Sequence, residues 1–461
     1  MLYIAIIVTL ATTLFKNTSY LRAKRDLLLS LKKAKGDIKG VKKSTSDILA
    51  KASQEIGDLR GRPLFYSAIF SGLGNGPLAE LIDGSIKYDF ITGIGTHFFG
   101  HSDLDLVGCA VEAASKNVVM QGNLQSSPEV KDFLETILKE AGGRLQYGWL
   151  APTGTDANEN ALKVIRHKKT PAHKIIAFKN CFHGRTLIMA DITDQDAYRK
   201  GLYRYHDAFY IPFYDVTDSQ SIQKSELALK EILSQHKAEI SGFVFELVQG
   251  EGGFNSAPPE FFKRLMTICK ENHIAVWVDE IQTVGRTGEL FAFQKLGLEE
   301  YVDIVTAGKM LQNCVTLYTK EYNPEAGLLA GTFCGSTVSL AVGRRVIERL
   351  KEEKFFGKNG KLAQLEKWAV KGLEDLQKRV GEEKVSHIGA IGAMVSWQFL
   401  DGSLEKTKEL ILKAFEEGIM VFYCGRGPYK IRFLLPGGCL TQAQYEKGLS
   451  FIEKAIKKVT L

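Results

Sequence analysis

The sequence predicts an α/β protein with a mixed, mostly parallel central sheet and a smaller α+β domain after it. Apolar runs that are typical of strands buried on both faces lie at residues 174–180, 242–248, 274–280 and 302–309. Amphipathic stretches alternate with these runs, as expected for a sheet that helices cover on both sides. From residue 346 onward, shorter strands alternate with helices, which indicates a smaller C-terminal α+β domain.

Length and composition narrow the class of protein. The chain has 461 residues, of which 45% are hydrophobic and 25% charged. This length favours more than one domain. The composition excludes a disordered, collagen-like or polytopic membrane protein. The seven cysteines are scattered and include no C-x-x-C pair. Their spacing argues against structural zinc or a disulfide framework and favours a reducing, cytoplasmic compartment.

The net charge of +7 is concentrated near the N-terminus. Residues 16–62 hold 13 Lys/Arg against 5 Asp/Glu, so the rest of the chain is nearly neutral. A nucleic-acid-binding groove would need basic residues clustered on the folded body, so we expect no nucleic-acid partner.

Residues 1–15 are apolar and without charge. As a helix they would span about 22 Å, short of the roughly 30 Å hydrocarbon core of a bilayer, and they lack the features of a signal peptide. Three interpretations remain: a weak membrane anchor, which we do not favour, a helix packed on the body, or translated sequence ahead of the true start. The spacing of Leu and Ile in residues 16–51 predicts a solvated helical arm.

Polar residues end each of the four apolar runs: Asn180, Glu246, Asp279 and Lys309. In open α/β sheets, ligands bind outside the carboxyl ends of the strands. We therefore expect these four side chains to meet at one site.

Common phosphate and metal motifs are absent. Gly308-Lys309 lacks the first glycine of a phosphate-binding loop, and GLGNGP (72–77) ends in proline where a dinucleotide motif needs glycine. His97 and His101 have helical metal spacing but no evident third ligand, so we expect no metal site.

One ordered series of motifs carries a family resemblance. The motifs are LAPTGTDANENALKVIR (150–166), KNCFHGRT (179–186), ELVQGEGG (246–253), WVDEIQT (277–283), DIVTAGK (303–309), GTFCGS (331–336) and YKIRF (429–433). With these motifs in this order, the sequence resembles the class III (ω-amino-acid) aminotransferases, pyridoxal-phosphate enzymes of fold type I, over about residues 60–455.

The resemblance implies pyridoxal 5'-phosphate as cofactor and assigns residues around its ring. Lys309 would form the Schiff base with the cofactor aldehyde and shuttle the proton. Asp279 would keep the ring nitrogen protonated, so that the ring can act as an electron sink. Gln282 would hydrogen-bond the phenolic oxygen, and Phe182 would stack on the ring.

The cofactor phosphate would rest on Gly154 and Thr155 at the start of a helix. In the family, a threonine of the neighbouring subunit completes this contact, and Thr332 matches it. The resemblance therefore implies a homodimer.

Substrate carboxylates need cationic partners. By resemblance, Arg185 and Arg432 are the two carboxylate-binding arginines. Glu251 matches the glutamate that pairs with the second arginine while an ω-amine donor is bound and swings away for the 2-oxo acid.

The sequence departs from the family pattern in three places. QTVGRTG (282–288) is one residue shorter than usual, and CGSTVS (334–339) replaces the common G-G-N-P. After Lys309, the stretch at 310–320 looks most like the lysine 6-aminotransferase branch, which also carries a Gln and a Cys there. These changes leave the amino donor open.

The resemblance implies transfer of an amino group from a lysine-, ornithine-, acetylornithine- or 4-aminobutyrate-type donor to 2-oxoglutarate. The alternatives are a mutase, racemase or decarboxylase with the same cofactor, or a non-catalytic homologue that acts as a scaffold. We expect an N-terminal arm (1–60), a segment that packs with the small domain (61–100), a large cofactor-binding domain (101–345) and a small domain (346–461).

Overall fold

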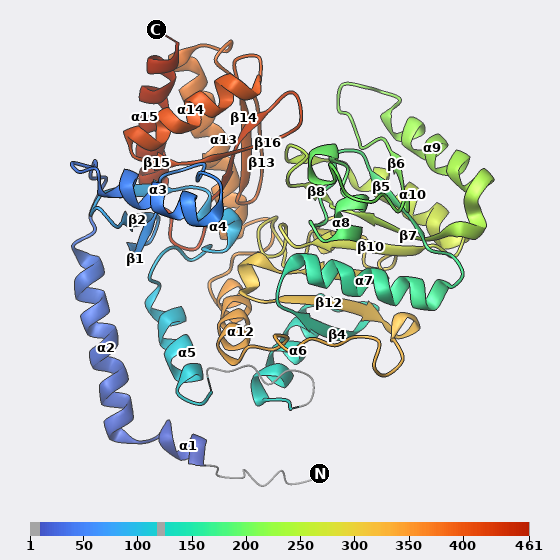
Figure 1. Cartoon of the computed structure of the whole chain (residues 1–461), viewed down its shortest axis with the longest axis horizontal. Coiled ribbons are helices and arrows are strands. Elements are labelled where there is room, and N and C mark those ends of the chain that lie inside the picture. Colours follow the sequence, from blue (N-terminus) through green and yellow to red (C-terminus); the bar gives the residue numbers. More distant parts are fainter. Residues whose placement is uncertain (1–9, 118–124, 461) are drawn as a thin grey trace.

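A seven-stranded sheet forms the centre of the larger part of the molecule, in the strand order β4-β12-β11-β10-β7-β5-β6 (Figure 1). The computed structural model describes residues 10–117 and 125–460. β6, β5, β7, β10 and β11 run parallel to one another, whereas β12 is antiparallel to both β11 and β4. The prediction of a mixed, mostly parallel sheet is confirmed. The strands are β4 (Leu145–Ala151), β5 (Lys174–Phe178), β6 (Ala208–Ile211), β7 (Ile240–Phe245), β10 (Ala275–Glu280), β11 (Ile304–Ala307) and β12 (Cys314–Thr319).

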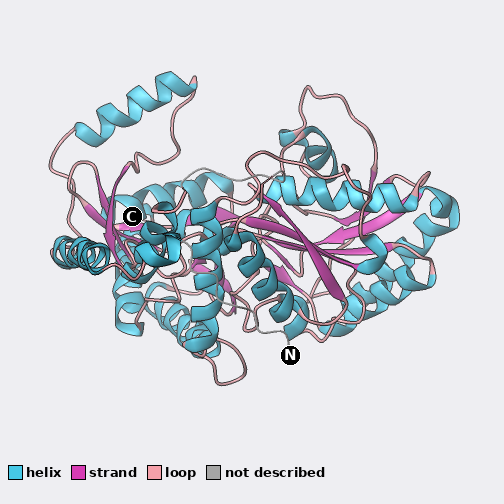
Figure 2. Ribbon diagram, turned by 90° about the horizontal axis from the view of Figure 1, so that it is seen from below, coloured by secondary structure: helices cyan, strands magenta, loops and turns pink. Residues whose placement is uncertain are grey.

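Helices cover both faces of this sheet (Figure 2). On one face, α7 buries Leu162 and Ile165 against Trp277 of β10. On the other face, α6, α9 and α10 pack Phe133, Leu229 and other apolar residues against the sheet. All six residues of β10 are buried, which explains its unbroken apolar run. The helices are α5 (Leu104–Ala114), α6 (Pro128–Ala141), α7 (Gly154–Lys169), α8 (Leu187–Ile192), α9 (Ser221–His236), α10 (Pro259–Glu271), α11 (Ala292–Lys295) and α12 (Thr337–Glu352).

The C-terminal part contains a second, antiparallel sheet in the order β13-β14-β17-β16. Three amphipathic helices pack their apolar sides against it, which agrees with the α+β prediction. The elements are α13 (Lys361–Val380), β13 (Val385–Ile391), β14 (Met394–Phe399), α14 (Leu404–Glu417), β15 (Ile419–Met420), β16 (Phe422–Cys424), β17 (Lys430–Leu434) and α15 (Gln442–Val459).

A third sheet joins the segment before the large domain to the C-terminal part. Its order is β1-β2-β3-β15, and β15 runs parallel to β3. The sheet is followed by a turn, labelled α4 (Thr92–Gly95), in which every residue has a positive φ. The strands are β1 (Phe70–Asn75), β2 (Leu78–Leu81) and β3 (Ile86–Asp89), and a two-stranded ribbon of β8 (Val248–Gln249) and β9 (Asn255–Ser256) lies in the large part.

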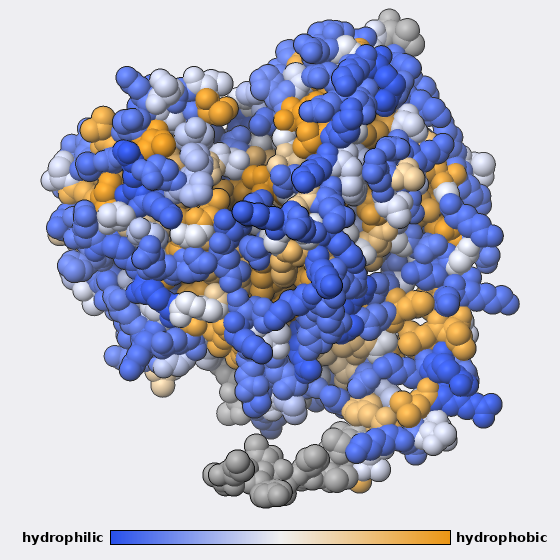
Figure 3. All heavy atoms as spheres, turned by 180° about the vertical axis from the view of Figure 1, so that it is seen from behind, coloured by the Kyte–Doolittle hydropathy of each residue, from blue (hydrophilic) through white to orange (hydrophobic). Residues whose placement is uncertain are grey.

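The N-terminal arm is helical, as predicted, and contains α1 (Leu10–Leu14), α2 (Thr18–Gly36) and α3 (Ile48–Arg60). One side of α2 contacts α5: Lys24 Nζ lies 2.7 Å from a carboxylate oxygen of Glu112. Leucines flanking that side remain about half exposed, and an apolar patch is visible there from behind (Figure 3). The arm is therefore not solvated all round.

Residues 1–9, which include most of the apolar N-terminal segment, lie outside the described residues. Within the described ranges, no helix combines the length and the apolar character needed to cross a membrane.

Candidate active site

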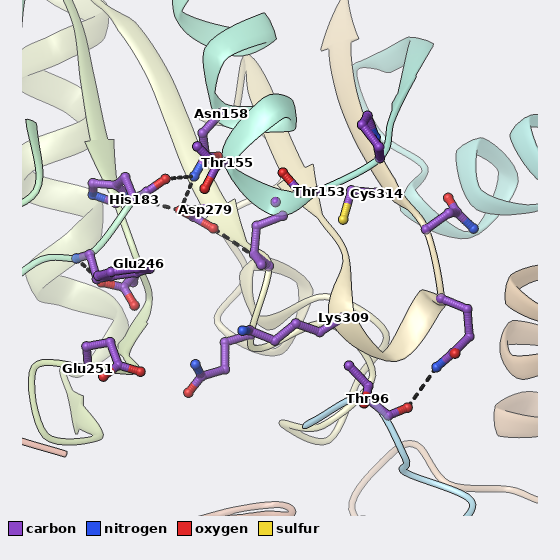
Figure 4. A pocket seen from close by; sticks show the side chains of 17 residues that line it. Thr96, Thr153, Thr155, Asn158, His183, Glu246, Glu251, Asp279, Lys309 and Cys314 are labelled. Atoms are coloured by element: carbon purple, nitrogen blue, oxygen red, sulfur yellow. Dashed lines mark hydrogen bonds and ion pairs between the residues drawn. The ribbon is translucent and has the colours of Figure 1, made fainter. Parts of the chain in front are cut away.

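A pocket of about 380 Å³ lies at the carboxyl ends of the parallel strands. The end of β10 contributes Asp279, and the loops after β7 and β11 contribute Glu246 and Lys309, as the strand-end argument predicted. The start of α7 closes another side. Figure 4 shows Lys309 reaching into the pocket, with Asp279, His183 and Asn158 at its far side.

Asn180, the fourth predicted strand end, does not line the pocket. β5 ends at Phe178, and Asn180 lies beyond it with a φ of 63°. Its backbone N–H donates to Asp194. The turn instead brings Phe182 and His183 to the pocket, so the prediction for Asn180 was wrong.

Lys309 lies two residues after the end of β11, on a backbone that is tightly turned. Lys309 has a φ of 45° and begins a single 3-10 turn. Burial lowers the pKa of its amine, and the positive charge of Arg432 lowers it further. A lowered pKa provides more of the neutral amine, which is the form that can act as a nucleophile or accept a proton.

Asp279 is the buried carboxylate at the end of β10. Its Oδ2 accepts hydrogen bonds from Nδ2 of Asn158 and, at the same distance of 2.8 Å, from Nδ1 of His183. Its Oδ1 accepts from the backbone N–H of Ile281 at 3.0 Å. These contacts hold the carboxylate in one orientation at the pocket wall.

His183 is fully buried behind Asp279. Burial alone would lower the pKa of its imidazole, but Cys181 and the hydrogen bond to Asp279 raise it well above the usual value. The hydrogen bond from His183 therefore places a positive neighbour behind the Asp279 carboxylate. Sequence reasoning did not assign His183 or Asn158, although both lie inside the motifs that carried the resemblance.

Glu246 connects two parts of the pocket. Its carboxylate oxygens accept the backbone N–H of Phe182 at 3.0 Å and that of Gly250 at 2.8 Å. Burial raises its pKa to about 7. Glu246 thereby fixes the backbone of Phe182 and of the turn that carries Glu251.

Arg432 and Glu251 form an ion pair of 2.7 Å. The Arg432 side chain is completely buried on β17, whereas that of Glu251 is 27% exposed. Nε and Nη2 of Arg432 are buried and have no hydrogen-bond partner in the described part of the chain. The Arg432 guanidinium therefore has N–H donors that a second carboxylate could accept. Of the two side chains in the pair, the partly exposed Glu251 is the one that can change position.

The first turn of α7 faces the pocket through Gly154 and Thr155. Thr153 caps the helix by accepting the backbone N–H of Asp156. A Cβ at Gly154 would lie 2.8 Å from Ile281, and one at Gly184 would lie 2.6 Å from the hydroxyl of Thr155. Because Gly154 and Gly184 have no Cβ, the chain can pack closely around the N-terminus of α7, which is suited to bind an anion.

Gln282 lines the same pocket, and its Oε1 is buried without a partner in the described residues. A Cβ on Gly250 would come within 2.6 Å of that oxygen. A side chain at position 250 would therefore collide with Gln282, so glycine is needed there.

Arg185 does not line the pocket. It is exposed, and its guanidinium carbon lies 3.9 Å from the ring centre of Tyr198. Tyr198 in turn packs edge-on against Phe182. Arg185 stands at the rim next to Phe182, and Tyr198 is a neighbour that sequence reasoning did not identify.

Thr332 is also exposed and does not line the pocket of its own chain. The stretch after Lys309, in contrast, takes part in the pocket through Gln312, Asn313 and Cys314. Nε2 of Gln312 donates to the carbonyl oxygen of Thr96 at 2.8 Å, so this stretch is tied to the N-terminal segment.

Comparisons with known proteins give one family. The family model "Aminotransferase class-III" matches residues 63–456. The acetylornithine aminotransferase of Lactococcus lactis is 30% identical over 81% of this chain and 93% of its own length. That of Caldanaerobacter subterraneus is 28% identical over 82% of this chain and 92% of its own. The fold of lysine aminotransferase from M. tuberculosis matches with a TM-score of 0.78 at 21% identity, over 88% of this chain and 99% of that one.

The raised pKa of Glu246 predicts a pH-dependent effect of Glu246→Gln on thermal stability. As pH rises from the ordinary value of 4.5 to about 7, the unfolded chain releases the Glu246 proton while the folded chain keeps it, so wild-type protein loses stability. Glutamine is neutral throughout. We expect the Tm difference, wild type minus variant, to fall by about 1–3 °C between about pH 5 and about pH 8.

Thermal unfolding of both proteins without added ligand measures this difference. Glu231→Gln, on an exposed part of α9, is the control and should give a difference that does not change with pH. A constant difference for Glu246→Gln as well would contradict the prediction.

Proposed function

The chain belongs to the class-III aminotransferases and is a transaminase that uses pyridoxal phosphate, and from its site we propose that it moves an amino group from an ω-amino or diamino acid to 2-oxoglutarate. The observation that carries the proposal is the ion pair between buried Arg432 and Glu251, because Glu251 lines the same pocket as Lys309. A pocket that must accept two different substrates in turn needs a carboxylate site that can be opened and closed. A mutase, racemase or decarboxylase handles one substrate and has no such need.

The pocket residues fit pyridoxal phosphate. Oε1 of Gln282 and Oδ1 of Asn158 are buried in the pocket lining and accept no hydrogen bond from the described residues, so each can accept one from a bound cofactor. The start of α7 offers backbone N–H groups for a phosphate. When bound, the cofactor supplies an electron sink. We assign Gly154 and Thr155 to its phosphate, Phe182 and Gln282 to its ring, and Lys309 and Asp279 to the catalytic roles.

Lys309 would hold the cofactor covalently and move the proton at the reacting carbon through its amine nitrogen. The lowered pKa of this amine supports the role, because the neutral amine is the reactive form. Asp279 would hold the proton on the ring nitrogen, and its contacts with His183 and Asn158 orient it for that task.

Glu251 would neutralise Arg432 while the ω-amine donor is bound. The strand position of Arg432 keeps the guanidinium in place, and the exposed side of Glu251 lets that side chain swing out. Arg432 would then clamp the α-carboxylate of the 2-oxo acid with the donors that are free in this structure. Arg185, at the rim, would hold the distal carboxylate of the donor.

We propose a homodimer in which Thr332 reaches the cofactor phosphate of the partner subunit. Thr332 is exposed and does not line the pocket of its own chain, which supports this arrangement, and a two-fold symmetric pair makes both sites equivalent. The cytoplasm is the proposed location, since all seven cysteines lie in the described residues and none forms a disulfide.

For the donor we propose lysine, ornithine, acetylornithine or 4-aminobutyrate, and within this set we favour lysine or a donor of similar length. Relatives named acetylornithine aminotransferase support the class of donor. The position of Gln312 and Cys314 in the pocket lining supports the likeness to the lysine 6-aminotransferase branch.

The first test locates the cofactor. Borohydride reduction of the loaded protein followed by peptide mapping should label Lys309, and Lys309→Ala should abolish the covalent link. Lys430→Ala is the matched control, because Lys430 is another partly buried lysine whose Nζ contacts the loop after Glu251. A label on any other lysine would refute the assignment.

The second test concerns Asp279→Asn. An amide cannot keep the ring nitrogen protonated, so we expect cofactor binding to persist while the half-reaction rate falls on the order of a hundredfold or more. Stopped-flow spectra with an amino donor measure the rate, and thermal unfolding checks the fold. A variant within about threefold of wild type would show that the carboxylate is structural.

The third test uses a panel of amino donors with wild type, Glu251→Ala and Glu251→Gln. Without the carboxylate, Arg432 stays charged and unpaired when an ω-amine donor enters. We expect kcat/KM for ω-amine donors to fall about tenfold or more in both variants, while glutamate changes by less than about threefold. Equal loss for both kinds of donor would reject the switch, and activity with short α-amino acids alone would reject the ω-amine donor.

A further inference from the structure

Arg286 is a buried charge that the proposed reaction does not use. It lies in the shortened turn QTVGRTG after β10 and is 1% exposed. Burial lowers its pKa to about 9, so it remains charged at neutral pH. Within the described ranges it forms no ion pair, and its Nε has no hydrogen-bond partner. A buried cation without an anion is costly, so its presence calls for an explanation.

The hydrogen bonds of Arg286 join three segments that are distant in the sequence. Its Nη2 donates to the carbonyl oxygen of Gly95 in α4. Its Nη1 donates to the carbonyl oxygen of Gln282 at 3.2 Å. Its own carbonyl oxygen accepts the N–H of Ala393, just before β14, at 3.0 Å. The N-terminal segment, the Gln282 loop and the small domain thus meet at one residue.

Glycines allow the three segments to pack closely around Arg286. A Cβ on Gly392 would lie 1.9 Å from the carbonyl oxygen of Arg286, and one on Gly95 would lie 3.0 Å from Nη2. On the other side of the turn, a Cβ on Gly285 would lie 2.6 Å from the sulfur of Met310, the residue after Lys309. The turn that carries Arg286 is therefore packed against the Lys309 turn.

Two routes lead from this junction to Arg432. In the first, α4 is tied to β17, because the hydroxyl of Thr92 donates to the carbonyl oxygen of Leu434 at 2.8 Å. In the second, β14 begins next to Ala393 and pairs with β17, with Ser396 opposite Arg432. A shift at the junction would displace β17, which carries Arg432 and its ion pair with the pocket residue Glu251.

We propose that Arg286 is a positioning residue that holds α4, the Gln282 loop and the small domain together, and so sets the places of Gln282 and Arg432 relative to Lys309. The proposal rests on the proposed function of these three residues. It explains why an arginine stands there: its planar guanidinium bonds two backbone carbonyls at once, and it stays charged where a buried lysine would lose its proton.

The positive charge of Arg286 also affects the pKa of Lys309, and an experiment can separate this effect from the positioning of the loops. Burial, Arg432 and Arg286 lower the pKa of Lys309, while Glu251 and Asp279 raise it. Removing the positive charge of Arg286 favours the protonated form of the Lys309 nitrogen. A purely structural residue would not change this titration.

The experiment compares wild type, Arg286→Gln and Arg349→Gln. Arg349 is the control, because it is a largely buried arginine that links α12 to Asp103 and does not act on Lys309. Peptide mapping first establishes that the wild-type cofactor is linked to Lys309. The pH titration of the cofactor absorbance, the KM for 2-oxoglutarate and thermal unfolding without cofactor are then measured.

For Arg286→Gln we expect the titration midpoint to rise by about half to one pH unit and the KM to rise about fivefold or more. Arg349→Gln should change Tm while leaving the midpoint and the KM as in wild type. If Arg286→Gln keeps the wild-type midpoint and KM, or if both variants change alike, the proposal is wrong. If the wild-type cofactor is not linked to Lys309, it is the proposed function that fails.

Arg286→Lys covers the case in which the glutamine variant does not fold. Lysine can reach one of the two carbonyls, so it should restore folding while the KM stays raised. An Arg286→Lys protein that matches wild type in both midpoint and KM would overturn the proposal.

Discussion

The parallel pairing of β10 with β11 is the constraint on which the site depends. In this register Asp279 lies opposite Thr306, and Glu280 lies opposite Ala307. Both chains therefore leave the sheet at the same edge, and Lys309 follows two residues later. Every residue of both strands is buried, and the register in which they pair sets the spacing of the two reactive groups.

The pocket brings together charges that would be costly if each stood alone. Asp279 is paired with His183, and Arg432 with Glu251. Lys309 lines the pocket together with Asp279 and Glu251, and burial and positive neighbours lower the pKa of its amine. The two pairs differ in access: His183 and Asp279 are sealed from solvent, whereas Glu251 is partly exposed. A sealed pair suits a permanent role towards the cofactor, and an accessible pair suits one that changes with the substrate.

The small domain acts on the pocket through backbone contacts as well as through Arg432. The N–H of Gly425 donates to the carbonyl oxygen of Glu251 at 2.9 Å, and Ala393 bonds to the turn of Arg286. One departure from the family pattern, the shortened turn at 282–288, contains Arg286 and so lies at the second of these contacts. The shortened turn and the stretch after Lys309 pack on each other through Gly285 and Met310, so we interpret them as matched changes in one wall.

The sequence by itself determined the strands, the helices and most of the residue types in the site. These follow from local patterns: an apolar run marks a buried strand, and polar residues such as Asp279 and Lys309 mark its end. Tertiary structure decided what local patterns do not contain. It joined Glu251 to Arg432, placed His183 behind Asp279, moved Arg185 to the rim against Tyr198, and turned Asn180 away. The physical reason is that periodicity reports which face of an element is buried, whereas ion pairs and hydrogen bonds between distant segments depend on how whole elements pack.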